Sequence, residues 1–297
     1  MPDRIRLDGR VAVVTGAAGV IGSATVRLLA ERGARIVAVD RKGADLEGAI
    51  RDLPASAQAL AVTSDVTDED EVKEYVRSAV DKFGTIDAFY NNAGVEGEVK
   101  SITEYSLEAF RRVLDVNVIG VFLGMKHVLP VMLKQNKGSI INTASIAGLI
   151  GSPHIAVYSA SKHAVVGLTK SASWECTGTG VRINCVCPGM IDSRMLSAII
   201  QGRAGGNAPP PAERIVERIP AAGLALRPRL RQLSHSLLPM KQAMSPAPPT
   251  PSTAAALPPE RFNRKTEVLS VCPSFSIPMP PPSTRPFRKP AVPPMRR

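Results

Sequence analysis

The feature that most limits what this chain can fold into is an alternation of short apolar runs with amphipathic segments over its first two thirds. VAVVTG at 11–16 leads into IGSATVRLLAERGA at 21–34, whose apolar residues recur at helical spacing before a closing glycine. The pattern then repeats, with predicted strands at 35–40, 57–66, 86–94, 138–145 and 181–189 and predicted helices at 68–84, 106–133 and 158–176. Apolar strands that are each followed by an amphipathic helix are typical of a parallel sheet covered on both faces. We therefore predict an α/β fold with a doubly wound parallel sheet and ligands at the carboxyl ends of its strands.

Charge and proline divide the 297 residues into two regions. From Ala222 onward there are 12 Lys or Arg against 2 Asp or Glu, so ten of the eleven net positive charges lie in this tail, together with 17 of the 26 prolines. The preceding region is near neutral, and its charge indicates no nucleic-acid partner. We predict one domain over 1–221 and a Pro-rich basic tail over 222–297.

The remaining composition favours a soluble protein without a metal site. No run approaches the roughly 18 apolar residues that a membrane span needs, and the N-terminus lacks the apolar core of a signal peptide, so we expect a cytoplasmic protein with no membrane partner. The four cysteines show neither CxxC nor paired metal-ligand spacing. Reduced thiols are therefore expected, with Cys185 and Cys187 as buried strand residues and no metal ligands.

A glycine-rich turn follows the first predicted strand. TGAAGVIG, from Thr15 to Gly22, stands directly before a helix, where glycines let the backbone approach a pyrophosphate and the helix N-terminus meets its charge. By itself such a turn is also compatible with a tight structural connection. Asp40 ends the second strand, where a carboxylate can accept hydrogen bonds from ribose hydroxyls and would repel a 2′-phosphate. This favours NAD over NADP, although Arg41 and Lys42 follow directly.

Tyr158 and Lys162 form a candidate acid–base pair. Positions i and i+4 share a helix face, and a nearby ammonium favours the phenolate, so we expect a lowered tyrosine pKa suited to proton transfer. Ser145, at the end of the neighbouring strand, could bind the substrate oxygen. Taken alone, a Tyr-x3-Lys pair would more simply be a surface pair.

Together these motifs resemble the short-chain dehydrogenase/reductase family over about Leu7 to Ala221, which implies a Rossmann-like fold and an alcohol dehydrogenase or reductase activity. The resemblance assigns the following residues to the cofactor site: Gly16, Ala17, Gly19, Val20, Ile21, Gly22, Asp40, Asp65, Val66, Asn92, Ala93, Gly94, Tyr158, Lys162, Pro188, Gly189, Ile191 and Ser193. Asn117, Ser145, Tyr158 and Lys162 match the family's catalytic tetrad in order and spacing.

The resemblance also implies a mechanism. Tyr158 takes the alcohol proton as hydride passes to the nicotinamide of NAD, Lys162 lowers the tyrosine pKa and holds the ribose, Ser145 orients the oxygen, and Asn117 supports a water that relays the proton. The expected substrate is a small secondary alcohol or ketone, with cyclic alcohols and dihydrodiols suggested by GSIINTAS and KHAVVGLTK. The family further implies a homo-oligomer, a tetramer or dimer.

Two positions depart from the family pattern. The middle glycine of the cofactor loop is replaced by Val20, with Gly19 one place earlier, so we expect a crowded pyrophosphate or an altered turn. Ser193 stands for the usual threonine and keeps the hydroxyl. The segment between Gly94 and Asn117 and a lid between Ser193 and Pro220 are expected to form the substrate pocket.

After Ala222 the family's last helix and strand do not follow. Read from the third base of each codon, Ala243 to Ala247 permits Y-V-T-G and Pro249 to Ala255 permits Y-T-V-D-G-G, the family's ending at its usual spacing. Our hypothesis is therefore a frameshift near Ala222, with the sheet lacking its usual last strand and becoming less stable. A tail that is disordered by composition is the alternative.

These features leave three functions open. The chain is an NAD-dependent alcohol dehydrogenase, a catalytically impaired relative with a damaged C-terminus, or a binding protein that docks its PxxP tail into an aromatic groove. The complete tetrad favours the first over the third.

Overall fold

The structure is a computed structural model that describes residues 6–204 and 269–271. Its strands form one seven-stranded sheet in the order β3-β2-β1-β4-β5-β6-β7. Their bounds are β1 Val11–Thr15, β2 Arg35–Asp40, β3 Ala59–Thr63, β4 Ala88–Asn91, β5 Gly138–Thr143, β6 Val181–Pro188 and β7 Leu269–Val271. The first six strands pair in parallel, which confirms the predicted doubly wound sheet. The chain reverses its direction of winding between β1 and β4, where ligands bind in open α/β sheets.

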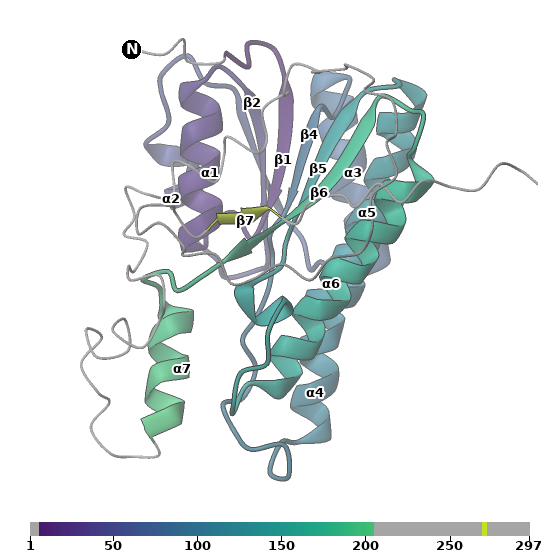
Figure 1. Cartoon of the computed structure of the whole chain (residues 1–297). Coiled ribbons are helices and arrows are strands. Elements are labelled where there is room, and N and C mark those ends of the chain that lie inside the picture. Colours follow the sequence, from purple (N-terminus) through teal and green to yellow (C-terminus); the bar gives the residue numbers. More distant parts are fainter. Residues whose placement is uncertain (1–5, 205–268, 272–297) are drawn as a thin grey trace, which may run out of the picture.

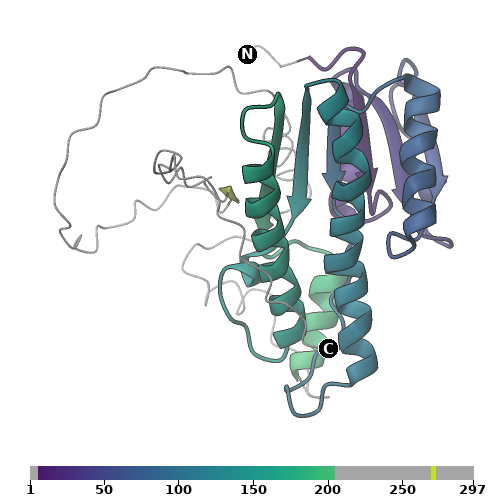
Figure 2. The same cartoon turned by 90° about the vertical axis from the view of Figure 1, so that its right-hand side faces the viewer.

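Helices cover both faces of this sheet. Their bounds are α1 Val20–Glu31, α2 Leu46–Arg51, α3 Glu69–Phe83, α4 Leu107–Leu114, α5 Gly120–Lys134, α6 Ala156–Glu175 and α7 Arg194–Ala204, with a 3₁₀ turn at Ile146–Gly148. Helices α1 and α2 lie on one face and α3, α5 and α6 on the other (Figure 1). Figure 2 shows α6, α5 and α3 side by side across the second face.

The core lies in two layers because side chains alternate along each strand. In β1, Val11 and Val13 face α3, α5 and α6, whereas Ala12 and Val14 face α1 and α2. All four are almost fully buried. Strands buried on both faces are apolar at most positions, and this explains the nearly continuous apolar runs in the sequence.

Helix α3 shows how local signals set an element's limits. Asp68 precedes it and accepts hydrogen bonds from the backbone N–H groups of Asp70 and Glu71, as an N-cap does. Gly84 ends it in the left-handed conformation, with φ of 79°. Its buried residues recur at helical spacing and pack onto the sheet: Val72, Tyr75, Val76 and Ala79.

A π-helical segment, Asp115–Ile119, joins α4 to α5. The run from Leu107 to Lys134 is long and apolar enough to cross a membrane by length and composition; an 18-residue stretch within it has a mean hydropathy of 1.7, and 44% of that stretch is buried. Its buried residues belong to the core beneath the sheet: Val121, Leu123, Met125, Val128 and Met132. Core helices of soluble proteins have this character as well.

A short strand covers the edge of β6. Among the described residues there is no seventh parallel strand; instead β7 pairs antiparallel with the last three residues of β6, Val186 opposite Val271. The rest of the predicted tail, like the lid beyond Ala204, lies outside the described residues.

Candidate active site

A cavity of about 1440 Å³ opens at the carboxyl ends of the parallel strands. It is larger than the roughly 300–1,000 Å³ of a typical small-ligand pocket. Most of the residues predicted for the cofactor and catalytic sites line it: Gly16, Gly19, Val20, Ile21, Asp40, Asp65, Val66, Asn92, Ala93, Gly94, Ser145, Tyr158, Lys162, Pro188, Gly189, Ile191 and Ser193. The other three predicted residues are buried and do not line the cavity: Ala17, Gly22 and Asn117. The structure thus gathers distant motifs around one space large enough for a dinucleotide and a second ligand.

The glycine turn depends on two of its three glycines. Gly16 has φ of +64°, and a Cβ on Gly22 would collide with the Gly16 carbonyl oxygen, so each position requires glycine. Gly19 is the N-cap of α1 with φ of −71°, a conformation open to any residue, and Val20 is the first residue of the helix. The backbone therefore accommodates the Val20 Cβ as the first residue of the helix, and the predicted crowding of a pyrophosphate stays a prediction. A close-packed turn before a helix N-terminus fits a pyrophosphate.

Asp40 fastens this turn to β2. One carboxylate oxygen accepts a hydrogen bond from the Ala18 N–H at 2.9 Å, and the other accepts one from the Arg41 N–H at 2.8 Å. The carboxylate also lines the cavity. It can therefore both support the turn and receive a hydroxyl of a bound ribose.

Thr15 joins the turn to β4. Its hydroxyl accepts hydrogen bonds from the N–H groups of Asn92 and Ala93, at 2.9 and 3.1 Å, while the Asn92 amide donates to the Thr15 carbonyl oxygen. Asn91 donates to the Val121 carbonyl oxygen on α5 at 2.9 Å. These contacts fix the two central strands at the point where the cavity floor forms.

Beyond β3, Asp65 and Val66, both predicted for the cofactor site, form part of the cavity wall. Asp65 accepts hydrogen bonds from the N–H and the hydroxyl of Thr67 through one oxygen, at 2.9 and 2.8 Å. Val66 is nearly buried and packs closely against Gly120. The pair offers an apolar surface beside a fixed carboxylate.

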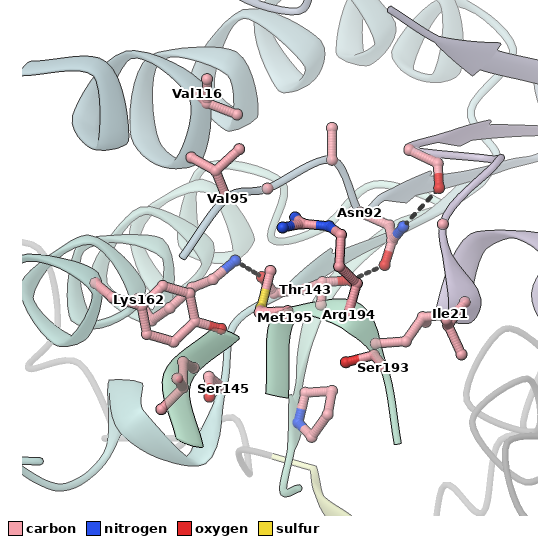
Figure 3. Close-up of a pocket in the computed structure, with 18 of the residues that line it drawn as sticks. Ile21, Asn92, Val95, Val116, Thr143, Ser145, Lys162, Ser193, Arg194 and Met195 are labelled. Atoms are coloured by element: carbon pink, nitrogen blue, oxygen red, sulfur yellow. Dashed lines mark hydrogen bonds between the residues drawn. The ribbon is translucent and has the colours of Figure 1, made fainter. Parts of the chain in front are cut away.

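The proposed catalytic groups meet at the other end of the cavity (Figure 3). Tyr158 and Lys162 project from α6, and Ser145 stands beyond the end of β5 as the cap of the 3₁₀ turn. The Lys162 ammonium donates to the Thr143 carbonyl oxygen at 2.8 Å and lies 5.7 Å from the centre of the Tyr158 ring. All three side chains are at least nine-tenths buried.

Burial governs the ionisation of this pair. It raises the pKa of Tyr158, against a lowering contribution from the hydrogen bond with Ser145, and the Glu96 carboxylate raises it further. Burial also lowers the pKa of Lys162 to about 8, with a small opposing effect from Cys187. The predicted lowering of the tyrosine pKa by Lys162 is therefore wrong, because desolvation of the phenolate dominates and the ammonium is turned toward Thr143.

Asn117 lies in the π-helical segment, where the widened turn aims its side chain at the loop after β4. Its amide accepts a hydrogen bond from the Val95 N–H at 2.8 Å and donates to the Val95 carbonyl oxygen at 2.9 Å and to the Ser161 hydroxyl at 3.0 Å. The side chain is fully buried and satisfied. It holds the loop and α6 together, and the predicted water relay stays a prediction.

Helix α7 closes the catalytic end of the cavity. Met195 and Ile199 pack with Val99 against an apolar cluster that includes Ala147 and Tyr158. The predicted loop Pro188–Ser193 leads into this helix, and the Ser193 hydroxyl accepts a hydrogen bond from the Leu196 N–H. The predicted pocket segments are thus brought together here, as far as Ala204.

Several site residues were not predicted from the sequence. Thr143 holds Lys162 through its backbone, while Glu96, Arg194 and Arg203 carry charge to the substrate end. A carbonyl contact leaves no signal in the sequence. The charged residues lie in the two predicted pocket segments, so the sequence could predict their positions but not their hydrogen-bond partners.

Comparisons with known proteins agree with this geometry. The family model described as "short chain dehydrogenase" matches residues 10–204. Levodione reductase of Leifsonia aquatica is 34% identical over 236 residues, which is 78% of this chain and 88% of that protein. Cyclohexanol dehydrogenase of Acinetobacter sp. (strain SE19) is 40% identical over 193 residues, 65% of this chain and 77% of that protein.

Solved structures show the same fold. The crystal structure of levodione reductase superposes with a TM-score of 0.74 at 34% identity and covers 78% of this chain and 91% of its own. NAD⁺-bound xylitol dehydrogenase gives a TM-score of 0.74 at 33% identity and covers 79% and 93%.

Proposed function

Because this chain belongs to the short-chain dehydrogenase family, we propose that it moves a hydride between an uncharged cyclic secondary alcohol and NAD. The observation that carries the proposal is the burial of Tyr158, Lys162 and Ser145 together at one end of a dinucleotide-sized cavity. When bound, the nicotinamide supplies the hydride acceptor. The protein's part is to position both ligands and to move one proton.

The protein groups divide this work. Tyr158 is the one phenol among the residues lining the cavity, and it takes the proton of the substrate hydroxyl. Ser145 lies beside it and donates a hydrogen bond to the substrate oxygen. Lys162 is held by the Thr143 carbonyl oxygen at the cavity wall, where its ammonium stabilises the phenolate once a substrate and cofactor exclude water.

NAD is favoured over NADP by the placement of Asp40. Its carboxylate lines the cavity at the end of β2 and is fixed by two backbone N–H groups, so a 2′-phosphate would meet a negative charge that cannot turn away. Arg41 lines the same region. We expect kcat/KM for NAD to exceed that for NADP, and substitution of Asp40 by Asn to reduce the difference; an unchanged cofactor ratio in Asp40→Asn would contradict this assignment.

An apolar cyclic substrate is favoured by the walls around Tyr158. Ala147, Ile155, Met195 and Ile199 form a single apolar cluster with that tyrosine. Levodione reductase and cyclohexanol dehydrogenase, to which the chain is similar, carry six-membered ring compounds in their names.

The test is oxidation of cyclohexanol by the full chain with NAD, followed by absorbance of the reduced nicotinamide. Removing the phenol by Tyr158→Phe should lower kcat/KM by about 10²–10⁴-fold, the usual contribution of a general base. Tyr75→Phe removes a phenol buried in α3 away from the cavity and should leave the rate unchanged. Equal rates for the wild type and Tyr158→Phe would refute the proposed function.

A further inference from the structure

Glu96 is a carboxylate held at a fixed place beside the catalytic groups. On one side of it, Asn117 clasps both backbone groups of Val95. On the other, Gly97 turns the chain with φ of +74°, and the Tyr105 hydroxyl accepts a hydrogen bond from the Glu98 N–H at 2.9 Å. The Glu96 side chain is 9% exposed. Its charge contributes to the raised pKa of Tyr158, which places it within electrostatic reach of the reacting hydroxyl.

Arg194, the first residue of α7, pairs with this carboxylate. The two guanidinium nitrogens donate to the two carboxylate oxygens at 2.8 and 3.2 Å, a bidentate arrangement. Unlike Glu96, the Arg194 side chain is 78% exposed and lines the cavity. Figure 3 shows it projecting into the pocket between Lys162 and Asn92.

The second cation of α7 is also engaged. Arg203 donates to the Ser152 hydroxyl at 2.7 Å and to the Pro153 carbonyl oxygen at 3.2 Å. Between the two arginines, Met195 and Ile199 contribute to the apolar cluster around Tyr158. Helix α7 therefore presents an apolar face to the substrate, and both of its cavity-lining cations are already bound to other groups.

We propose that the Glu96–Arg194 pair selects substrates by their charge. By binding Arg194, Glu96 restricts the site to uncharged alcohols and ketones. This inference rests on the proposed function of the same site. A carboxylated ligand could recruit Arg194 only by leaving the buried Glu96 carboxylate unpaired, which is strongly unfavourable. An uncharged ring leaves the pair intact.

The test measures equilibrium binding of cyclohexanecarboxylate and of its uncharged isostere cyclohexanecarboxamide to the full chain at saturating NAD, by calorimetry. The wild type should bind the carboxylate no better than the amide. In Glu96→Gln, Arg194 becomes free to pair with the ligand, so the preference for the carboxylate over the amide should rise by at least about tenfold, the low end for a hydrogen bond between charged groups. Because binding is measured, the result does not depend on whether cyclohexanol is oxidised.

Matched variants separate this role from a structural one. Glu98→Gln makes the same change two residues away in the same loop, on a carboxylate that does not contact Arg194, and should leave the preference as in the wild type. Glu96→Gln combined with Arg194→Gln should abolish the gain. Arg194→Gln alone, at an exposed side chain, leaves the Glu96 carboxylate unpaired, and its negative charge should then weaken carboxylate binding relative to the amide. This variant serves as the test if Glu96→Gln fails to fold, and a wild type that prefers the carboxylate over the amide would by itself overturn the proposal. The proposal would be overturned if the preference for the carboxylate over the amide is the same in Glu96→Gln as in the wild type, or if its increase persists in the double variant. If only Arg194→Gln folds, a preference equal to that of the wild type would overturn it.

Discussion

Replacing Lys162 by Met should make the ligand-free protein more stable at neutral pH while removing its activity. In the folded chain the pKa of this lysine is lowered by burial from 10.5 to about 8. The unfolded chain therefore holds the proton up to a higher pH than the folded chain does. Between pH 8 and 10.5 the unfolded state binds more protons, so wild-type stability should rise with pH across this window relative to a variant without the amine.

The magnitude follows from the same two values. They differ by about 2.5 pH units, and each unit corresponds to about 1.4 kcal/mol, so the charged amine costs the folded state about 3 kcal/mol at pH 7. Met has a similar length and no charge, but it leaves the Thr143 carbonyl oxygen without its donor, a loss of about 1 kcal/mol. Lys162→Met should thus gain about 2 kcal/mol at pH 7 and lose this advantage by about pH 10.

Urea unfolding of both proteins without cofactor, at several pH values from 7 to 10, measures this difference directly. Lys170→Met makes the same change at an exposed position of α6 and should show no such dependence. If the stability difference between the wild type and Lys162→Met is constant with pH, burial does not lower the lysine pKa and the reasoning fails.

Three further predictions follow from the contacts of the site. Gly22→Ala should weaken NADH binding, measured by fluorescence, by at least about tenfold, because its Cβ would collide with the Gly16 carbonyl oxygen. Gly19→Ala should weaken binding much less, because its Cβ would lie 3.2 Å from the same oxygen, a tight contact that a small shift relieves; equal effects would contradict the turn geometry. Asn117→Ala should lower the free energy of unfolding by about 2–3 kcal/mol, since the backbone N–H and C=O groups of Val95 both lose their hydrogen-bond partner. A loss below about 0.5 kcal/mol, typical of surface changes, would show that Asn117 does not hold this loop in place. The kcat/KM of alcohol oxidation should increase with pH up to about pH 8, because the pKa of Tyr158 is raised and the phenolate is the base. Above about pH 8 the increase should weaken, since Lys162 then loses the ammonium that stabilises the phenolate. Ketone reduction should be favoured at neutral pH, and a plateau of oxidation near pH 7 would show that Tyr158 does not govern the rate.

The part of the fold that could be predicted is the part in which apolar residues dominate the strands and recur at helical spacing along the helices. Such strands appear as continuous apolar runs, and their helices as periodic segments, so β1 to β6 and α1, α3, α5 and α6 were accessible. Helix α2, six residues long and capped by Asp45, is too short for a periodic signal. The pairing of β7 with β6 joins residues about 80 positions apart and has no local pattern.

The site divides in the same way. Residues at strand ends and at i, i+4 on a helix could be placed, because strand direction and helix geometry bring them together. The Glu96–Arg194 pair could not be predicted, since it joins the loop after β4 to the first residue of α7, 98 residues further along the chain. The direction of the tyrosine pKa was missed because residue spacing indicates which charges are near but says nothing about how much water is excluded.

The anchoring of Lys162 on the backbone of β5 has a consequence for divergence within this fold. The amine of Lys162 is positioned by a main-chain oxygen of the sheet, and no substitution at Thr143 removes this oxygen. The walls of the substrate pocket, in contrast, come from α7 and from the segments after β4 and β5. Mutations in these walls can therefore change the substrate specificity while Tyr158 and Lys162 keep their positions. New substrates become accessible in small steps, none of which requires the catalyst to be rebuilt.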